Sequence, residues 1–316
     1  MSAVAGAPAP TVVAGRPGIA ARLASLLRQV LASRLGLVGA LIVLAVVLAA
    51  WLAPVISPYD PVAVDLELKL QPPSLAHLMG TDQAGRDILS RALWGARVSL
   101  LVGVIAVAIG LVGGIVLGTL AGFYAGTLLE QAIMRTVDAL FSIPLLVWAI
   151  AVVGIVGVGP ITLGPLSIPN EGKVILLVGF LYVPAIARVT YSVVLAESRA
   201  DYVRARRVQG ANDLEIMATE ILRNCLSPLI VQATLFIAVG IIVEASLSFV
   251  GLGVQPPKPS WGSMLADARG YVFSGEWWLP VFPGLFISFT VIGFNLLGDA
   301  LRDVLDPRKR EAGLVV

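Results

Sequence analysis

Charged, redox-active and metal-binding side chains are scarce in this chain of 316 residues. Asp, Glu, Lys and Arg make up 13% of it, against about 25% in a typical soluble domain, while 58% is hydrophobic. A net charge of +2 gives no support for nucleic-acid binding. One cysteine, Cys225, and one histidine, His77, allow no internal disulfide and no closed zinc or iron–sulfur site. We therefore expect a membrane protein with no catalytic residues, no bound metal and no nucleic-acid partner.

Long runs without charge indicate where the chain crosses the membrane. A helix of about 20 apolar residues spans a bilayer, and the charge-free runs offer six such stretches. Arg188 interrupts the fourth, which is the weakest. The expected spans are 36–53, 98–123, 134–158, 174–192, 227–250 and 280–299. The predicted fold class is an all-α membrane protein with six transmembrane helices.

The distribution of Lys and Arg predicts the orientation of these spans. Cytoplasmic segments carry an excess of basic residues, and fifteen of the 22 Lys and Arg residues fall on the side that holds both termini. We therefore expect the N- and C-termini in the cytoplasm, with an amphipathic helix from Ile19 to Leu35 lying on the membrane surface. The predicted parts are a tail with this helix (1–34), the first span and outer loop (35–97), a five-span core (98–302) and a C-terminal tail (303–316).

Two long segments, 54–97 and 251–279, are expected on the outer side. The first is predicted to begin a helix near Thr81 or Asp82, and His77 within it is expected at the surface rather than on a metal. Tryptophan is enriched at head-group depth, which favours membrane anchoring over ligand stacking. The tryptophans concerned are Trp261, Trp277 and Trp278.

The polar stretch 197–224 contains the most informative local pattern. Residues 198–209 are good helix formers, and Gly210 can take the left-handed conformation that ends a helix. Asn212 with Glu215 three residues later forms an N-cap of the capping-box type. Apolar residues then line one face: Leu214, Met217 and Ile221. A solvated basic connector would not need such a helix, so the pattern indicates docking to a partner or to the membrane surface.

This stretch resembles the EAA loop of ABC importer permeases, where a glycine between two short helices fits a cleft of the cytoplasmic ATPase. Three more segments resemble the C-type subunit of the dipeptide/oligopeptide/nickel branch. They are GTDQAGRDILSR at 80–91, EASLSFVGLGVQPPKPSWG at 244–262 and FNLLGDALRDVLDP at 294–307. The resemblance extends from about residue 30 to residue 308 and implies the type I ABC importer permease fold.

The resemblance implies an inner-membrane permease of a bacterial or archaeal importer, most often for di- or oligopeptides. Nickel, opine, glutathione and oligosaccharide importers share the pattern and remain alternatives. The implied partners are a homologous B-type permease, one or two ATPase subunits, an extracytoplasmic substrate-binding protein and membrane lipid. ATP and Mg would bind the partner ATPase and no cofactor this chain, because the chain lacks the Gly-x-x-x-x-Gly-Lys-[Ser/Thr] motif.

The residues implied for ATPase coupling lie around the central glycine. They are Arg204, Ala205, Arg206, Gly210, Asn212, Asp213, Ile221 and Leu222. Arg206 and Arg223 depart from the family pattern, which has a small residue and a proline there. Either they meet acidic groups of the partner or they face solvent.

A few polar residues and glycines inside the predicted spans are further candidates. Glu244, with Ser246 and Ser248, would contact cargo or a partner, or else bond to another helix; several such buried groups would be needed for an ion-coupled secondary transporter. Asp138 is expected to pair with Arg135, three residues earlier. Glycines every four residues allow close helix approach, either within the chain or against the partner permease. They are Gly110, Gly114, Gly118 and Gly122.

Overall fold

The computed structural model describes residues 19–157, 159–163 and 166–305, and helices dominate them. The predicted tails therefore lie partly outside the described residues, at 1–18 and 306–316. The helices are α1 (Ile19–Ala32), α2 (Arg34–Ile56), η1 (Leu66–Leu68), α3 (Ile88–Phe123), α4 (Leu128–Phe141), α5 (Leu145–Val156), α6 (Asn170–Glu197), α7 (Asp201–Val208), α8 (Asp213–Glu215), η2 (Ile216–Ile221), α9 (Leu222–Phe249), α10 (Trp261–Ala268), η3 (Arg269–Tyr271) and α11 (Trp278–Leu305). A small hairpin pairs β1 (Ile161–Leu163) with β2 (Leu166–Ile168) in antiparallel register.

Five helices are long and apolar enough to cross a membrane: α2, α3, α6, the continuous helix 213–249 and α11. The stretch predicted as one span at 134–158 differs, because α4 and α5 meet at an angle of 87°. Pro144 lies at this break. Proline lacks an N–H, and it disfavours the helical conformation of the residue before it, here Ile143. The two pieces together make a sixth span if the bent pair crosses as one.

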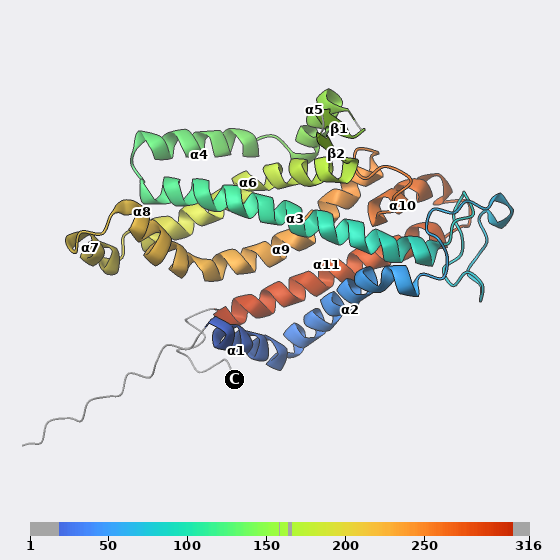
Figure 1. Ribbon diagram of the computed structural model, residues 1–316, viewed down its shortest axis with the longest axis horizontal. Helices are drawn as coiled ribbons and strands as arrows, with labels where there is room; N and C mark the ends of the chain where they lie inside the picture. The colour runs from blue at the N-terminus through green and yellow to red at the C-terminus, as the bar shows by residue number, and fades with distance from the viewer. Residues whose placement is uncertain (1–18, 158, 164–165, 306–316) are drawn as a thin grey trace, which may run out of the picture.

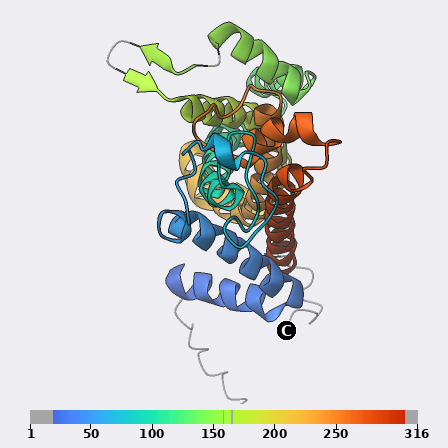
Figure 2. The same ribbon diagram turned by 90° about the vertical axis from the view of Figure 1, so that its right-hand side faces the viewer.

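The helices run along the long axis of the molecule, with α3 in the middle (Figures 1 and 2). α1, the end of α11 and the pair α7–α8 lie at one end, whereas α10 and the loop after α2 lie at the other (Figure 1). α2 flanks one side of the bundle, and α4 with the β1–β2 hairpin flanks the opposite side (Figure 2). The two ends of the helical bundle therefore differ, because each presents its own polar segment: α7–α8 at one end, and the loop after α2 with α10 at the other.

The closest helix pair is α3 with α6, and glycines permit it. A Cβ at Gly118 would lie 2.5 Å from Cβ of Thr190, and one at Gly114 would lie 2.6 Å from Cβ of Ile186. Gly110 and Gly122 meet α6 in the same way. Without side chains at these positions the two backbones approach closely and bury both helices over most of the length of α6.

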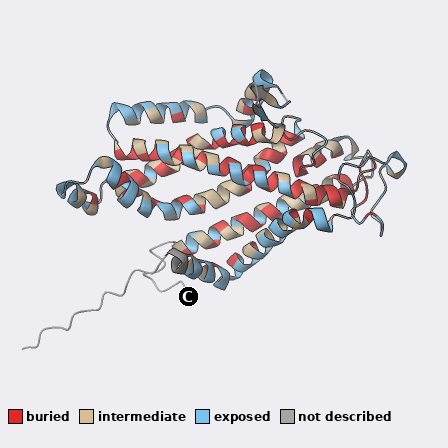
Figure 3. Ribbon diagram, in the orientation of Figure 1, coloured by how far each residue is buried: buried red, intermediate tan, exposed pale blue. Residues whose placement is uncertain are grey.

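α2 is the least buried of the long helices, and much of its ribbon is pale blue in Figure 3. Its buried residues are small: Gly36, Gly39, Ala50 and Ala53. Gly36 and Gly39 face α11, because a Cβ at Gly36 would lie 2.9 Å from Cβ of Ala300 and one at Gly39 would lie 2.7 Å from the amide nitrogen of Leu297. α1 joins this pair through Val30, which packs with Ala300 and Val304 of α11. Val43 and Val46 pack partly against the core, whereas many other large apolar side chains of α2 are exposed, among them Leu41, Leu44 and Trp51.

Candidate functional site

The polar segment between α6 and α9 forms a helix, a glycine turn and a second helix at one end of the molecule (Figure 1). α7 ends before Gly210, whose φ of +85° is the left-handed conformation that the sequence predicts. The amide of Glu215 then donates a hydrogen bond of 2.8 Å to the Asn212 side chain, which caps α8. A Cβ at Gly210 would meet nothing within 4 Å, so the tip of the turn is open.

Exposed apolar side chains stand on both sides of this turn. Val208 is 89% exposed and Leu214 is 72% exposed. The sequence predicted one apolar face of Leu214, Met217 and Ile221 that is available for docking, but Met217 and Ile221 are buried and Leu214 alone of the three is exposed. Leu214 comes too early in the helix to reach the core, and with Val208 it gives the turn an apolar surface. Arg204 and Ala205 are exposed on α7 as well.

The side chain of Arg206 is 32% exposed and pairs with two acidic residues of the same chain. Its guanidinium pairs with Glu215 at 2.6 Å and with Glu220 at 3.2 Å. These pairs fasten α7 to the helix after the turn, and only the folding of the turn brings the two acids to Arg206. The arginine that departs from the family pattern therefore stabilises the shape of the segment.

Two contacts join the segment to the end of α3. The Tyr124 hydroxyl donates a hydrogen bond of 3.2 Å to Asp213, and the Arg207 guanidinium lies 5.1 Å from the centre of the Phe123 ring. Burial and the nearby Asp213 carboxylate raise the pKa of Tyr124. Its hydroxyl therefore keeps its proton at neutral pH and remains a donor. The sequence contained no local signal for these contacts, since they depend on how α3 and α8 pack.

A second tyrosine holds the start of the segment. The Tyr202 hydroxyl donates to Glu197 at 2.6 Å and accepts from the side-chain amide of Asn224 at 3.0 Å. Burial and the hydrogen bond to Glu197 raise the pKa of Tyr202 to about 12. This contact ties the end of α6, α7 and the start of α9 together.

Glu244 in α9 is fully buried and bonds to neighbouring helices. Ser99 of α3 donates to one carboxylate oxygen at 2.9 Å, and Ser248 donates to the other at 2.7 Å. Ser99 in turn accepts from the backbone N–H of Trp261 at 3.3 Å. The carboxylate therefore joins α3, α9 and α10. Ser246 takes no part, because its exposed hydroxyl donates to the carbonyl of Ile242.

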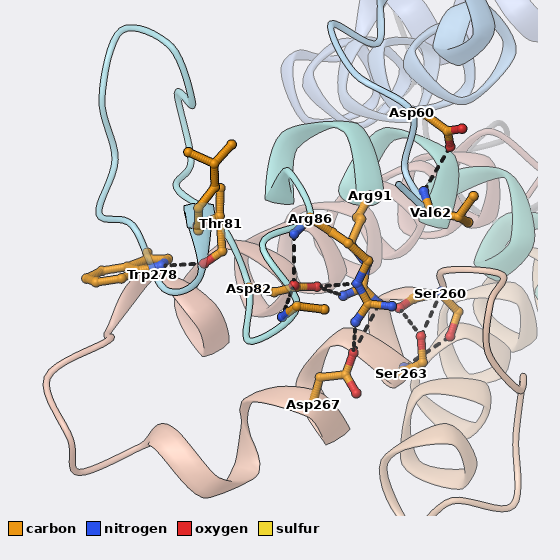
Figure 4. Close-up of polar contacts among 12 residues, drawn as sticks. Asp60, Val62, Thr81, Asp82, Arg86, Arg91, Ser260, Ser263, Asp267 and Trp278 are labelled. Carbon is orange, nitrogen blue, oxygen red and sulfur yellow. Dashed lines mark hydrogen bonds and ion pairs between the residues drawn. The ribbon is translucent and has the colours of Figure 1, made fainter. Parts of the chain in front are cut away.

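The segment before α3 forms a buried ionic cluster with α10 (Figure 4). Asp82 pairs with Arg86 at 2.7 Å and with Arg91, and Arg91 also pairs with Asp267 of α10 at 3.0 Å. The helix predicted from Thr81 or Asp82 begins only at Ile88 with an Asp87 cap. Asp82 instead accepts the backbone amides of two following residues, which holds this stretch in a turn.

Two surface predictions for the outer segments are wrong. His77 is 8% exposed, and its Nδ1 lies 3.0 Å from a carboxylate oxygen of Asp87. Trp261 is fully buried and donates to the carbonyl of Ala92, while Trp278 is 7% exposed. Of the three tryptophans, Trp277 alone is exposed. The two segments expected on the outer side fold back on α3, and this covers side chains that were expected at the surface.

Asp138 also has a different partner from the predicted one. Its carboxylate pairs with Arg188 of α6 at 2.6 Å, where the sequence suggested Arg135. α4 runs beside α6, so the guanidinium of the neighbouring helix reaches Asp138. Arg188 lies over the Phe141 ring at 4.7 Å as well. The charge that weakened the fourth predicted span is thus neutralised between α4 and α6.

The sequence matches two family models. Residues 114–311, which contain both the glycine turn and Glu244, match the model described as "Binding-protein-dependent transport system inner membrane component". The chain belongs to this family. Residues 22–73 of the permease match a second model, "N-terminal TM domain of oligopeptide transport permease C". The resemblance found in the sequence is therefore confirmed, and the permease is a multi-pass protein of the inner membrane.

Related proteins align with most of the permease. The di/tripeptide transport system permease protein DppC of Pseudomonas aeruginosa (strain UCBPP-PA14) is 44% identical over 87% of this chain and 88% of its own. The dipeptide transport system permease protein DppC of Escherichia coli K12 is 43% identical over 87% and 89%. The probable D,D-dipeptide transport system permease protein DdpC of the same organism is 39% identical over 87% and 88%. The permease is similar to these proteins along nearly its whole length.

Proposed function

We propose that this permease forms half of the translocation pathway of an ATP-driven importer whose cargo is a di- or oligopeptide. The names of its relatives, which describe dipeptide and di/tripeptide transport, support this cargo. Nickel, opines, glutathione and oligosaccharides are the alternative cargoes for the same architecture. The second half of the pathway is a homologous B-type permease. A substrate-binding protein delivers the cargo on the outer side.

The permease crosses the membrane six times in this proposal, with α4 and α5 together as the third span. Both termini lie in the cytoplasm with the segment 197–224. Two observations support this arrangement: α1, the end of α11 and α7–α8 share one end of the molecule (Figure 1), and basic residues concentrate there. The loop after α2 and α10 then face outward.

ATP is hydrolysed, with Mg, on one or two partner ATPase subunits that dock at the glycine turn. The observation that carries this docking site is the open tip at Gly210 between exposed Val208 and Leu214. Apolar side chains on a polar, rigidly capped turn fit a partner's cleft better than they fit water. Of the residues implied by the resemblance, Arg204, Ala205, Gly210 and Asn212 are exposed and form the docking surface, with Arg206, Asp213 and Leu222 half-buried beside them. Ile221 is fully buried and supports the segment from the core.

A substitution at the turn tests the docking site. Gly210→Val forces a β-branched residue into the left-handed conformation, which distorts the tip without a clash in the permease itself. We expect the reconstituted importer to lose most of its ATP hydrolysis stimulated by the binding protein and peptide. Gly270→Val is the control, because Gly270 lies in open space and has no left-handed φ. Normal assembly and normal stimulated hydrolysis in Gly210→Val would contradict the docking site.

Uptake into vesicles tests the cargo. Proteoliposomes containing the complete importer and loaded with ATP should accumulate a labelled dipeptide only when the binding protein is added outside. If the vesicles accumulated nickel or an oligosaccharide and no peptide, the peptide would be excluded as cargo and the accumulated compound would be the cargo.

A further inference from the structure

A cavity of about 280 Å³ lies at the break between α4 and α5. α4, α5, α6 and α9 all contribute to its wall, and the wall is rich in aromatic rings. The lining residues include Pro144, Trp148, Phe180, Tyr182, Pro184 and Phe236. Pro184 stands near the middle of the spanning helix α6, so the cavity lies deep in the membrane.

Backbone polar groups on both sides of this cavity lack helical partners. No side chain caps the first turn of α5 after Pro144. Opposite, Pro184 has no N–H to donate to the carbonyl of Phe180, four residues earlier in α6. The Trp148 indole does close part of the break by donating to the carbonyl of Leu140 at 3.1 Å.

The tyrosine on the cavity wall contributes its ring and not its hydroxyl. The ring of Tyr182 packs against Phe236, with 5.3 Å between the ring centres. The hydroxyl is buried near Gly240, which does not line the cavity. The cavity is therefore apolar in its walls and bordered by the backbone groups at the break and at Phe180.

This combination indicates which occupant fits. Non-helical backbone at membrane depth persists where protein buries it or where it lines a water-filled path, and a lipid chain cannot satisfy it. Broken helices in transporters mark cargo sites for the same reason. The lining includes no Asp, Glu, His or Cys, so a metal cation would find no ligands. A peptide supplies both an apolar side chain and amide groups.

We propose that this cavity is a station of the translocation pathway that receives one apolar side chain of a peptide in transit. The peptide's amide groups face the unpaired groups at the break and at Phe180. The volume is slightly below the ~300–1,000 Å³ of pockets that enclose whole ligands, so the cavity holds a part of the cargo. The inference rests on the proposed import of peptides and adds a residue-level selectivity to it.

The test compares two labelled dipeptides, Ala-Ala and Phe-Phe, in proteoliposomes with the complete importer. Ala185 lines the cavity, and Ala185→Leu fills part of it. We expect uptake of Phe-Phe, relative to the unsubstituted importer, to fall at least five-fold more than uptake of Ala-Ala. Phe236→Ala enlarges the cavity and should shift the same ratio toward Phe-Phe by two-fold or more. Dividing each uptake by that of the unsubstituted importer cancels the binding protein's own preference.

Ala196→Leu is the matched control, because Ala196 is exposed on the same helix and outside the cavity lining. Co-purification of the subunits and basal ATP hydrolysis establish that each variant assembles. An assembled Ala185→Leu importer with unchanged or equally reduced uptake of both peptides would overturn the proposal and indicate a lipid or packing site. If the unsubstituted importer takes up neither peptide but takes up another cargo, the proposed function fails instead.

Discussion

Tyr124 and Asp213, 89 positions apart, are joined by a hydrogen bond of 3.2 Å between the phenol and a carboxylate oxygen. Tyr124 follows the last residue of α3, and Asp213 begins α8, three residues after Gly210. Movement of a docked ATPase at the glycine turn would therefore reach α3 directly, as well as through α6 and α9. α3 is the helix that the other spans surround (Figure 2).

Removing this hydroxyl should weaken the coupling between ATP hydrolysis and transport. Tyr124→Phe keeps the ring and loses one hydrogen bond, a net change of about 1 kcal/mol or roughly a factor of five in an equilibrium. We expect hydrolysis stimulated by binding protein and peptide to fall two- to five-fold relative to basal hydrolysis. Tyr59→Phe is the control, since that hydroxyl donates to the carbonyl of Ala76 at the other end of the molecule. Equal stimulation in both variants would exclude a role for the Tyr124 bond.

We expect Glu244 to stabilise the fold as a hydrogen-bond acceptor, so stability should depend on its oxygen atoms more than on its charge. Glu244→Gln keeps an acceptor, and the Ser99 and Ser248 hydroxyls can rotate to accommodate the new amide. Glu244→Ala removes the acceptor of both hydroxyl protons and opens a cavity, at a cost of about 3–5 kcal/mol. The thermal unfolding midpoint of the purified permease should drop clearly for Ala and little for Gln, with exposed Glu67→Ala as control. Loss of uptake in the Gln variant at normal stability would instead point to cargo contact.

The α3–α6 contact should be intolerant of a single added methyl group. Gly118→Ala places Cβ 2.5 Å from Cβ of Thr190 and 2.6 Å from the carbonyl oxygen of Ala187, so one backbone must move. We expect a loss of about 1–3 kcal/mol of stability, typical of overpacking. Gly154→Ala in α5 meets nothing within 4 Å and should leave the permease as stable or slightly more so. Comparable unfolding midpoints for the two variants would show that α3 and α6 separate easily.

The ionic cluster should hold the segment before α3 against α10. Arg91→Ala leaves buried Asp82 with Arg86 alone and removes one partner of Asp267. Breaking a buried pair costs about 3–5 kcal/mol, and the lower end applies here because Arg86 remains. Trypsin should then cut after Arg86 several times faster than in the unsubstituted permease. Arg97→Ala, at an exposed position of the same helix, should leave the cleavage rate unchanged, and resistance of Arg91→Ala would refute the role of the cluster.

Most helices could be predicted from hydropathy, but the start of α3 could not. The expected span began at 98 because Arg91 and Arg97 carry charge, whereas α3 begins at Ile88. Arg91 is buried there by Asp267, 176 positions away, and no local pattern contains that pairing. Hydropathy gave no sign of the break at Pro144 either, because the residues on both sides of it are apolar.

In the glycine turn, too, some features have local causes and others depend on long-range packing. Gly210 and Asn212 follow rules of helix ends that operate within a few residues, so the sequence predicted their conformations. Arg206 meets Glu220 only after the turn has folded, and Leu214 is exposed because α8 starts away from the core. Contacts set by packing, such as these, require the structure.

α3 contains 36 residues without a proline, which corresponds to a rod of about 54 Å at the rise of an α-helix. The hydrocarbon core of a bilayer is only about 30 Å thick, so the rod also reaches well beyond it. Stretching an α-helix would break its backbone hydrogen bonds, so α3 resists a change in the distance between its two ends. Arg91 of the ionic cluster lies near one end, and Tyr124, which bonds to Asp213 beside the glycine turn, lies at the other. When the permease changes conformation, α3 therefore tilts or rotates as one rigid helix. A movement of its end near the glycine turn moves its end at the ionic cluster as well.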